Sequence, residues 1–421
     1  MKQIVTKNSK KVNENKIIGT ADIGLTKNMG YCRSTAGNEM KPFEFSNNDE
    51  GFRKFWDTIV QFKEQEQIET IMIGIESTGV YGAPFLNFMK DKPVELVQVN
   101  PKHTKRIKEI VDNSPLKSDK KDPKVIADII ELGRYLSVVV PEGAAAELRI
   151  LTHARERVLR RINILNNQLH ALVFTIFPEF IHTMKDLKTK SAQYILEHMP
   201  TPEDIIQYGK ERLTDKLREV SRGMLSEERA GVLYESAQRT VGIQEGRISI
   251  VKEIRMIVNE MRQSAHYMEE IERDMTMLLK QISYARNILS VKGIGPVITA
   301  GLIGEFADLR KFRNSQQVLK YAGLNLFEIS SGNRRGQRRI SKIGRSLIRK
   351  LLFFAVINMI RNGGIMHERY LSYCKRGMMK IKAIIAIMRK VLSLIFALVR
   401  HNTEYQNDYL VFGVQQIKQA A

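Results

Sequence analysis

Four acidic residues in the first third of the chain have the types and positions of a metal-binding site. Asp22 ends an apolar run that starts at Ile17, and Glu76 ends a second run that starts at Ile71. Both runs are short and bounded by glycine or polar residues, so they predict buried strands. A carboxylate at the end of a buried strand is costly to desolvate unless a cation pairs with it, and a divalent metal ion is the natural partner.

Asp119 and Asp122 complete this set of acids. They stand three residues apart at a predicted helix start, so both can lie on one helix face. Two-metal phosphoryl chemistry needs carboxylates that converge from different segments, because two cations about 4 Å apart must share ligands and leave sites for water and phosphate. The alternative is structural: Asp119 caps the helix and Asp122 completes an arrangement like a capping box. The four acids taken together favour the metal site.

The charge of the chain favours a polyanionic partner. Lysine and arginine number 67 against 46 acids, which gives a net charge of +21 over 421 residues, and nucleic acid is the first expectation. Cys32 and Cys374 show no zinc or disulfide spacing, which predicts a reducing, cytoplasmic compartment. The apolar runs 351–360 and 391–399 are roughly half the length of about 20 residues that crosses a bilayer. Neither a membrane span nor a signal peptide is predicted.

The first 140 residues alternate strand and helix patterns, which is typical of a mixed α/β sheet with helices packed on it. A hairpin is predicted through 43–45. Asn48 is then predicted to cap a helix whose apolar residues repeat at helical spacing. A short helix over 81–89 and a strand over 94–99 continue the series, and a further helix is expected after that strand.

From about residue 145 the pattern becomes helical. Polar helices are predicted from Pro178 to Gln244, and a long helix from Gln244 to Ala285. The two long helices predict a hairpin or coiled coil that acts as a spacer and dimerisation arm, although an ordinary antiparallel bundle shows a similar seam. The heptad positions in the first long helix are Leu151, Val158, Leu165 and Leu172, interleaved with Ile162, Leu169 and Ile176.

Two basic features follow in the last third of the chain. Lys292, Gly293 and Gly295 form a turn between helices whose backbone N–H groups can bind a phosphate, with a tight turn that binds nothing as the alternative. The segment from Arg310 to Lys350, called the basic island, holds many cations but a single acid, Glu328. A solvated surface normally mixes signs. The predicted phosphate contacts in this island are Arg334, Arg335, Arg338, Arg339, Lys342, Arg345 and Arg349.

Ser330 and Ser331 lie on a glycine-containing loop inside the basic island. A hydroxyl surrounded by guanidinium groups can attack phosphorus, because the cations stabilise the charge that develops on the phosphate. A serine in such a loop is usually just a loop residue, so composition alone assigns neither of them a catalytic role.

The order and spacing of these motifs resemble the DEDD transposases of bacterial insertion sequences, a group that includes bridge-RNA-guided recombinases and pilin-gene DNA invertases. The resemblance spans nearly the whole chain. Its N-terminal part rests on the motifs around Asp22, Glu76 and the pair Asp119 and Asp122. Its C-terminal part rests on Gly293-Ile294-Gly295, Tyr321-Ala322-Gly323-Leu324, Ser331-Gly332 and Ile340-Ser341-Lys342-Ile343-Gly344-Arg345.

This resemblance implies a RuvC-like, ribonuclease H-like domain over 1–144, a helical coiled-coil linker within 145–286, and a mostly α-helical transposase domain over 287–421. The helical segment from Pro178 to Gln244 is an insertion beyond a minimal spacer and departs from the family pattern. It implies that the four acids bind a divalent metal, expected to be Mg²⁺, and that Ser331 is the nucleophile, with Ser330 as a one-residue alternative. The implied partners are donor and target DNA, a structured noncoding guide RNA and further copies in a dimer or tetramer. The implied place of action is the bacterial nucleoid.

The sequence thus favours an insertion-sequence transposase that cleaves and rejoins DNA. One rival interpretation is a RuvC-like junction nuclease that uses the four acids and water. Another is a non-catalytic coiled-coil protein that binds nucleic acid and whose acids only cap helices.

Overall fold

The computed structural model describes residues 15–76, 79–112, 122–225, 227–328, 336 and 338–406. The chain divides into two compact units. The first unit comprises Met1–Arg149 together with Leu279–Ala421, and the second comprises Ile150–Leu278.

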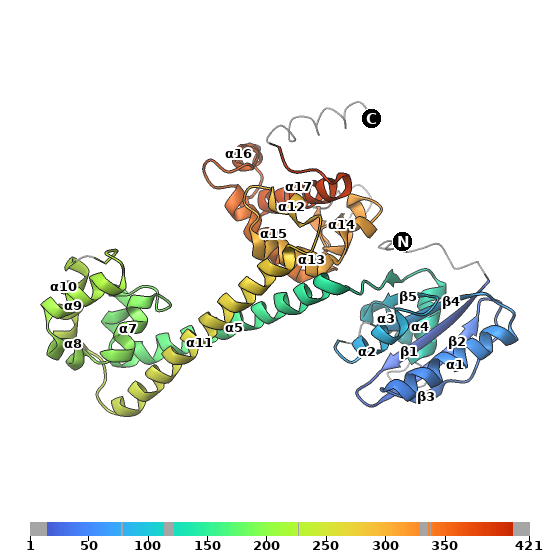
Figure 1. The fold of residues 1–421 in the computed structure, drawn as a ribbon, viewed down its shortest axis with the longest axis horizontal. Coiled ribbons are helices and arrows are strands. Elements are labelled where there is room, and N and C mark those ends of the chain that lie inside the picture. Colours follow the sequence, from blue (N-terminus) through green and yellow to red (C-terminus); the bar gives the residue numbers. More distant parts are fainter. Residues whose placement is uncertain are drawn as a thin grey trace. The chain divides into compact units, whose positions relative to one another are not determined.

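A six-stranded sheet forms the N-terminal part of the first unit (Figure 1). The strand order is β3-β2-β1-β4-β5-β6, in which β1, β4 and β5 are parallel and the other strands are antiparallel to their neighbours. The strands are β1 (Lys16–Ile23), β2 (Lys27–Ser34), β3 (Phe43–Ser46), β4 (Thr70–Glu76), β5 (Val94–Val99) and β6 (Leu136–Ser137).

Helices cover both faces of this sheet. On one face, α1 (Asp49–Gln65) and α2 (Gly82–Met89) bury aromatic side chains against the strands. On the other face lies α4 (Asp122–Glu131), with α3 (Pro101–Asp112) beside it. The Asn48 side chain accepts a hydrogen bond from the Gly51 N–H at 2.9 Å, as predicted for a helix cap. The predicted mixed α/β sheet is confirmed.

Two long antiparallel helices run through the second unit, α5 (Gly143–Ile176) and α11 (Arg247–Leu279) (Figure 1). Thr201 and Asp204 form a capping box at the start of a helix in this unit. The helix predicted to reach Ala285 is shorter than expected: α11 ends at Leu279, and a separate helix starts at Ala285. The helices between α5 and α11 are α6 (Pro178–Thr183), α7 (Lys190–His198), α8 (Pro202–Tyr208), α9 (Lys210–Val220) and α10 (Glu227–Gln238).

Ion pairs and packing join α5 to α11 within the chain. Arg155 pairs with Glu272 at 2.7 Å, and Arg161 pairs with Glu260 at 2.9 Å. Of the predicted heptad residues, Leu165, Leu169 and Ile176 are buried in one core with Ile254, Val258 and Met261, whereas Leu151, Val158, Ile162 and Leu172 are only half-buried. This seam therefore forms inside one chain, as the helical-hairpin interpretation expects, and association of copies stays a prediction.

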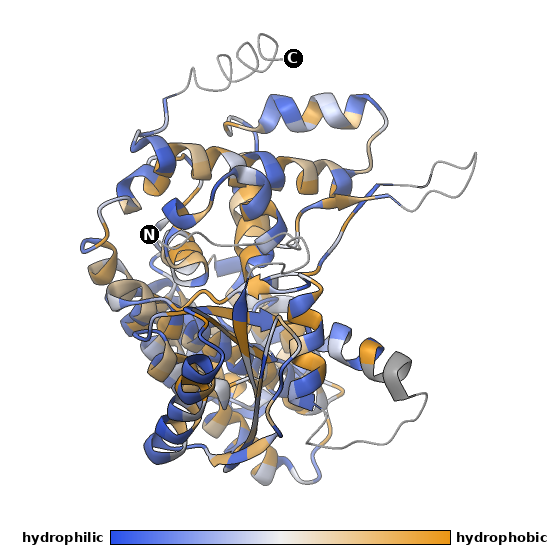
Figure 2. Cartoon of the chain, turned by 90° about the vertical axis from the view of Figure 1, so that its right-hand side faces the viewer, coloured by the Kyte–Doolittle hydropathy of each residue, from blue (hydrophilic) through white to orange (hydrophobic). Residues whose placement is uncertain are grey.

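The C-terminal part of the first unit is mostly helical. Figure 2 shows its helices as alternating hydrophilic and hydrophobic bands, which is typical of helices that bury one face. No helix in the described part of the chain is long and apolar enough to cross a membrane. Its elements are α12 (Ala285–Leu289), α13 (Pro296–Phe306), the 3₁₀ helix η1 (Leu309–Lys311), α14 (Ser315–Tyr321), β7 (Leu326–Phe327), β8 (Arg339–Ile340), α15 (Ser346–Met359), α16 (His367–Lys375) and α17 (Lys380–His401).

Candidate active site

The parallel register of β1 and β4 brings two of the predicted acids together. Ala21 lies opposite Ile75 in the ladder, so Asp22 and Glu76 follow on adjacent strands at the same sheet edge. Both side chains are half-buried. Carboxyl ends of parallel strands are where α/β sheets commonly place their ligand sites.

Asp22 leaves the sheet on the face that α4 covers. Successive strand residues point to opposite faces. Ile18 packs with the α4 side of the core, and the Thr20 hydroxyl donates to the carbonyl oxygen of Pro123 in α4 at 2.7 Å. Asp22 continues this alternation and therefore faces the beginning of α4.

Glu76 lies on the same face by the same alternation. Met72 packs with the α4 side of the core. At Gly74 the helix comes so near that a Cβ atom would lie 2.1 Å from Cδ1 of Ile130, so a larger residue would displace that side chain. Glu76 is two residues beyond Gly74 and shares its face.

Asp122 adds a third acid at this edge. It is the first residue of α4 and is only 8% exposed. The next residue, Pro123, accepts the hydrogen bond from Thr20 of β1. Arg33 of β2 clamps the same helix through ion pairs of 2.7 Å to Asp128 and to Glu131.

The donor chemistry of this edge suits a hard divalent cation. Asp22, Glu76 and Asp122 supply carboxylate oxygens, which Mg²⁺ prefers over the nitrogen and sulfur ligands typical of zinc sites. Among the residues that the structure describes, which include Asp22, Glu76 and Asp122, no three His, Cys, Asp or Glu side chains lie close enough together to hold a metal ion. Asp119 lies outside the described residues, so a complete four-acid site stays a prediction.

His103 is a candidate that the sequence patterns do not single out. It lies in the first turn of α3, which follows β5, and the carboxyl end of β5 is next to that of β4. Its Nδ1 is buried and has no hydrogen-bond partner among the described residues. An imidazole nitrogen at this edge can donate or accept a hydrogen bond. The one sequence signal for His103 is its position just after the end of a predicted strand.

The glycine-rich turn between α12 and α13 has the backbone that its sequence requires. Gly293 has φ of 98°, and a Cβ there would lie 2.7 Å from Cγ of Met359. Gly295 directly precedes α13, whose first residue is Pro296, and Lys292 is exposed. The first N–H groups of a helix lack helical partners and can bind a phosphate. Contact with nucleic acid through this turn stays a prediction.

A short hairpin carries the loop that contains the candidate nucleophile. Its strands pair Leu326 with Ile340 and Phe327 with Arg339, and Arg338 forms an ion pair with Glu328 at 2.9 Å. The hairpin therefore holds the two ends of the loop together. Ser330, Ser331, Arg334 and Arg335 lie outside the described residues.

The base of this hairpin, residues 341–345, is called the hairpin root and is bound to the end of α14. Gly344 has φ of 147°, and a Cβ there would lie 2.5 Å from the carbonyl oxygen of Tyr321. Lys342 in the same segment is exposed. Three backbone hydrogen bonds hold the root, from Ser341 to Asn325 at 2.9 Å, from Lys342 to Gly323 at 3.1 Å and from Arg345 to Tyr321 at 3.1 Å.

Arg345 and Arg349 have partners inside the chain at the hairpin root. Nη1 of Arg345 lies 3.5 Å from the carboxylate of Glu305, a residue that is 1% exposed. Nη1 of Arg349 donates to the carbonyl oxygens of Ala322 at 3.0 Å and Gly344 at 3.2 Å, and burial lowers the pKa of Arg349. Both guanidinium groups therefore stabilise the root, and their contact with nucleic acid stays a prediction.

Two family models match the chain. One, described as a transposase of the IS110 DEDD type, matches residues 20–178, which include all four predicted acids. The other, described as the IS116/IS110/IS902 transposase family, matches residues 285–371, which include the glycine-rich turn, the hairpin and its root.

Relatives extend this likeness along the chain. The insertion element IS110 43.6 kDa protein of Streptomyces coelicolor is 20% identical over 390 residues, which is 92% of this chain and 94% of the relative. The insertion element IS116 44.8 kDa protein of Streptomyces clavuligerus is 23% identical over 68% of this chain and 71% of its own length. A probable family 20 transposase of Pseudomonas aeruginosa is 24% identical over 36% of this chain and 46% of its own length. The chain therefore belongs to the IS110 family of DEDD transposases and is a DNA transposase.

Proposed function

We propose that this transposase cleaves and rejoins DNA with a metal site made by four acids and with Ser331 as the nucleophile. The observation that supports the proposal is the placement of Asp22 and Glu76 at one edge of the sheet, on the face to which Thr20 binds the start of α4. We assign this sheet to a RuvC-like catalytic domain, followed by the helical arm and the C-terminal transposase domain.

Membership of the DEDD family implies dependence on a divalent metal. We propose that the ion is Mg²⁺ and that Asp22, Glu76, Asp119 and Asp122 hold it, because they offer only oxygen ligands. A divalent cation bound there would stabilise the negative charge that develops on a phosphate under attack.

The serine step exchanges one phosphate ester for another. The Ser331 hydroxyl loses its proton, its oxygen bonds to phosphorus, and the bond from phosphorus to one deoxyribose oxygen breaks. That oxygen takes up a proton. Rejoining reverses the step with the hydroxyl of another strand end, so no external energy source is needed. Arg334 and Arg335 stand near Ser331 in the sequence and would stabilise the attacked phosphate.

A comparison of Ser331→Ala with Ser330→Ala tests this assignment. Ser331→Ala should keep DNA binding, because a methyl group replaces one hydroxyl, and should lose both recombination and a covalent protein–DNA adduct. Ser330→Ala is the matched control and should recombine at close to the wild-type rate. Metal-dependent cutting by Ser331→Ala at the wild-type rate would instead support a nuclease that uses water.

We also propose that a structured noncoding RNA guides the choice of DNA and that copies of the chain assemble as a dimer or tetramer. The protein would then bind backbone and shape while base pairing selects sequence. The large excess of lysine and arginine supports a nucleic-acid partner of this kind. Sequencing the RNA that copurifies with the protein tests the guide, and a random mixture of cellular RNA would contradict it.

A further inference from the structure

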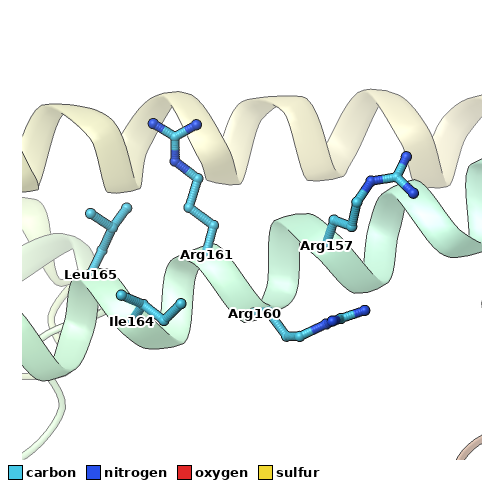
Figure 3. A pocket seen from close by; sticks show the side chains of 5 residues that line it. All are labelled: Arg157, Arg160, Arg161, Ile164 and Leu165. Carbon is cyan, nitrogen blue, oxygen red and sulfur yellow. The ribbon is translucent and has the colours of Figure 1, made fainter.

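The solvent face of α5 is basic near the middle of the helix. The sequence from Arg157 to Pro178 contains no acidic residue. Exposed arginines are concentrated at the start of this stretch, where Arg157, Arg160 and Arg161 line a shallow depression of about 440 Å³ together with Ile164 and Leu165 (Figure 3). We call these three arginines and Lys188 the arm cations.

The three arginines do not all point the same way (Figure 3). Figure 3 shows Arg161 directed toward α11, where it pairs with Glu260 at 2.9 Å, and Arg160 directed away from α11. Arg157 forms no hydrogen bond or ion pair with any residue that the structure describes. Among the described residues, Arg160 bonds only to the backbone, since its Nε donates to the Glu156 carbonyl oxygen at 3.3 Å.

A further cation comes from the segment before α7. Nζ of Lys188 donates to Oδ1 of Asn163 at 2.9 Å, and Asn163 is one turn from Arg160 on α5. Asn167 and Gln168 are exposed farther along the helix. Ile164, which is 58% exposed, adds an apolar side chain to the lining of the depression. The surface therefore offers guanidinium, ammonium and amide donors without a carboxylate of α5 among them.

The antiparallel partner helix α11 is different. Its exposed side chains include Lys252 beside Glu253, and Arg273 beside Asp274. Mixed signs of this kind are what a solvated helix normally shows. Because the two helices belong to one hairpin but only α5 has a face of one sign, solvation alone does not account for the arm cations.

We propose that the arm cations bind the phosphate backbone of a nucleic-acid duplex, at a surface separate from the acid site and from the basic island. Guanidinium groups bind phosphate oxygens through paired N–H donors, and such contacts position a duplex without reading its bases. This surface lies outside the machinery proposed for catalysis. It anchors the duplex to the helical arm.

Salt-dependent binding by the full-length double variant Arg157→Gln/Arg160→Gln tests the proposal. The probes are a DNA duplex of arbitrary sequence and an RNA hairpin. The slope of log affinity against log salt should flatten by about two units, one for each lost phosphate contact. The probe whose slope changes identifies the nucleic acid that the arm binds. Glutamine is a good helix former, and thermal melting checks that the fold is kept.

The matched control is Lys252→Gln/Arg273→Gln, which removes the same charge from α11 and should leave both slopes at their wild-type values. Ser331→Ala should also leave them unchanged, so a failure of the serine mechanism would be distinguishable from a failure of the arm surface. Unchanged slopes for Arg157→Gln/Arg160→Gln on both probes would overturn the proposal. Unchanged slopes with a lower oligomer mass in sedimentation would also overturn it, and would assign this face to a second copy of the chain.

Discussion

The acid edge of the sheet and the hairpin root position their residues in different ways. Asp22 and Glu76 lie on strands of eight and seven residues that are paired on both sides and covered by helices. The loop of the candidate nucleophile instead leaves two strands of two residues each. The acids are therefore placed by backbone register, and the loop by a few contacts around Tyr321, Arg345 and Arg349.

This difference indicates which substitutions each region tolerates. A long ladder keeps its register when one side chain changes, because a one-residue slip would turn every buried residue to the wrong face. A two-residue ladder has no such protection. Substitutions around the acid edge should therefore affect chemistry only at the acids themselves, whereas substitutions around the root should affect both stability and recombination.

The largest effect is expected from the acids. Asp22→Asn and Glu76→Gln should each abolish recombination while the protein stays folded, because each removes a ligand charge from the metal site. Recombination assays with circular dichroism measure both. Glu95→Gln is the control, since Glu95 lies near the opposite end of the sheet and pairs with Lys16. Normal recombination by Asp22→Asn would remove this residue from the site.

A second large effect is expected in the buried core of the second unit. Leu165 is buried between α5 and α11, and Leu165→Ala should lower the free energy of unfolding by about 3 kcal/mol. Its neighbour Ile164 is exposed, so Ile164→Ala should cost less than about 0.5 kcal/mol. Urea unfolding compares them. Equal costs would show that the seam inside the chain does not stabilise it.

At the hairpin root, Arg345→Met should lower the free energy of unfolding by about 2 kcal/mol, because it removes a cation from beside the buried Glu305 carboxylate. It should also slow recombination, since the root orients the loop. Arg361→Met, at an exposed site, should change stability by less than about 0.5 kcal/mol. If Arg345→Met and Arg361→Met recombine equally fast, the root does not position the loop.

The counterpart near the acid edge is Arg33, which clamps α4 through Asp128 and Glu131. Arg33→Met should cost about 1 kcal/mol, because the pairs are only partly buried, and recombination should continue. This result would sharpen the contrast with Arg345. Complete loss of recombination in a folded Arg33→Met protein would show instead that side-chain contacts, rather than register alone, place the acids.

The smallest expected effect depends on pH. The hydrogen bond from Tyr31 and the neighbouring Lys124 lower the pKa of Glu39 below its ordinary value of 4.5. A group with a lowered pKa in the folded state contributes stability above its unfolded pKa and loses it as pH falls through the folded pKa. Acid should therefore destabilise the sheet, and Glu39→Gln should flatten this part of the dependence in unfolding measurements. A profile that Glu39→Gln leaves unchanged would show that the carboxylate contributes nothing.

Sequence patterns predict the sheet and the positions of its acids because both follow from local periodicity. Apolar runs that end in Asp22 and Glu76 indicate the strands, and the order of motifs indicates the family. No local pattern could predict the hydrogen bond between Thr20 and Pro123, because it joins residues that are far apart in the chain. The partner of Arg345 was missed for the same reason, since Glu305 lies 40 residues before it.

The heptad pattern was informative only in part. It identifies Leu165, Leu169 and Ile176, which are buried, but it also selects Leu151 and Val158, which are half-buried. Which residues of α5 are buried depends on the helices that pack against it, and those helices cannot be identified from the sequence of α5 alone.

The central claim is that the acid edge and the loop serine act on the same phosphate. It is tested most directly by trapping covalent protein–DNA adducts from wild type, Ser331→Ala and Asp22→Asn, followed by mass spectrometry of the modified peptide. The account predicts that wild type carries a nucleotide on Ser331 and that both variants form no adduct. Wild-type amounts of adduct in Asp22→Asn, or strand cleavage by wild type without any adduct, would contradict it.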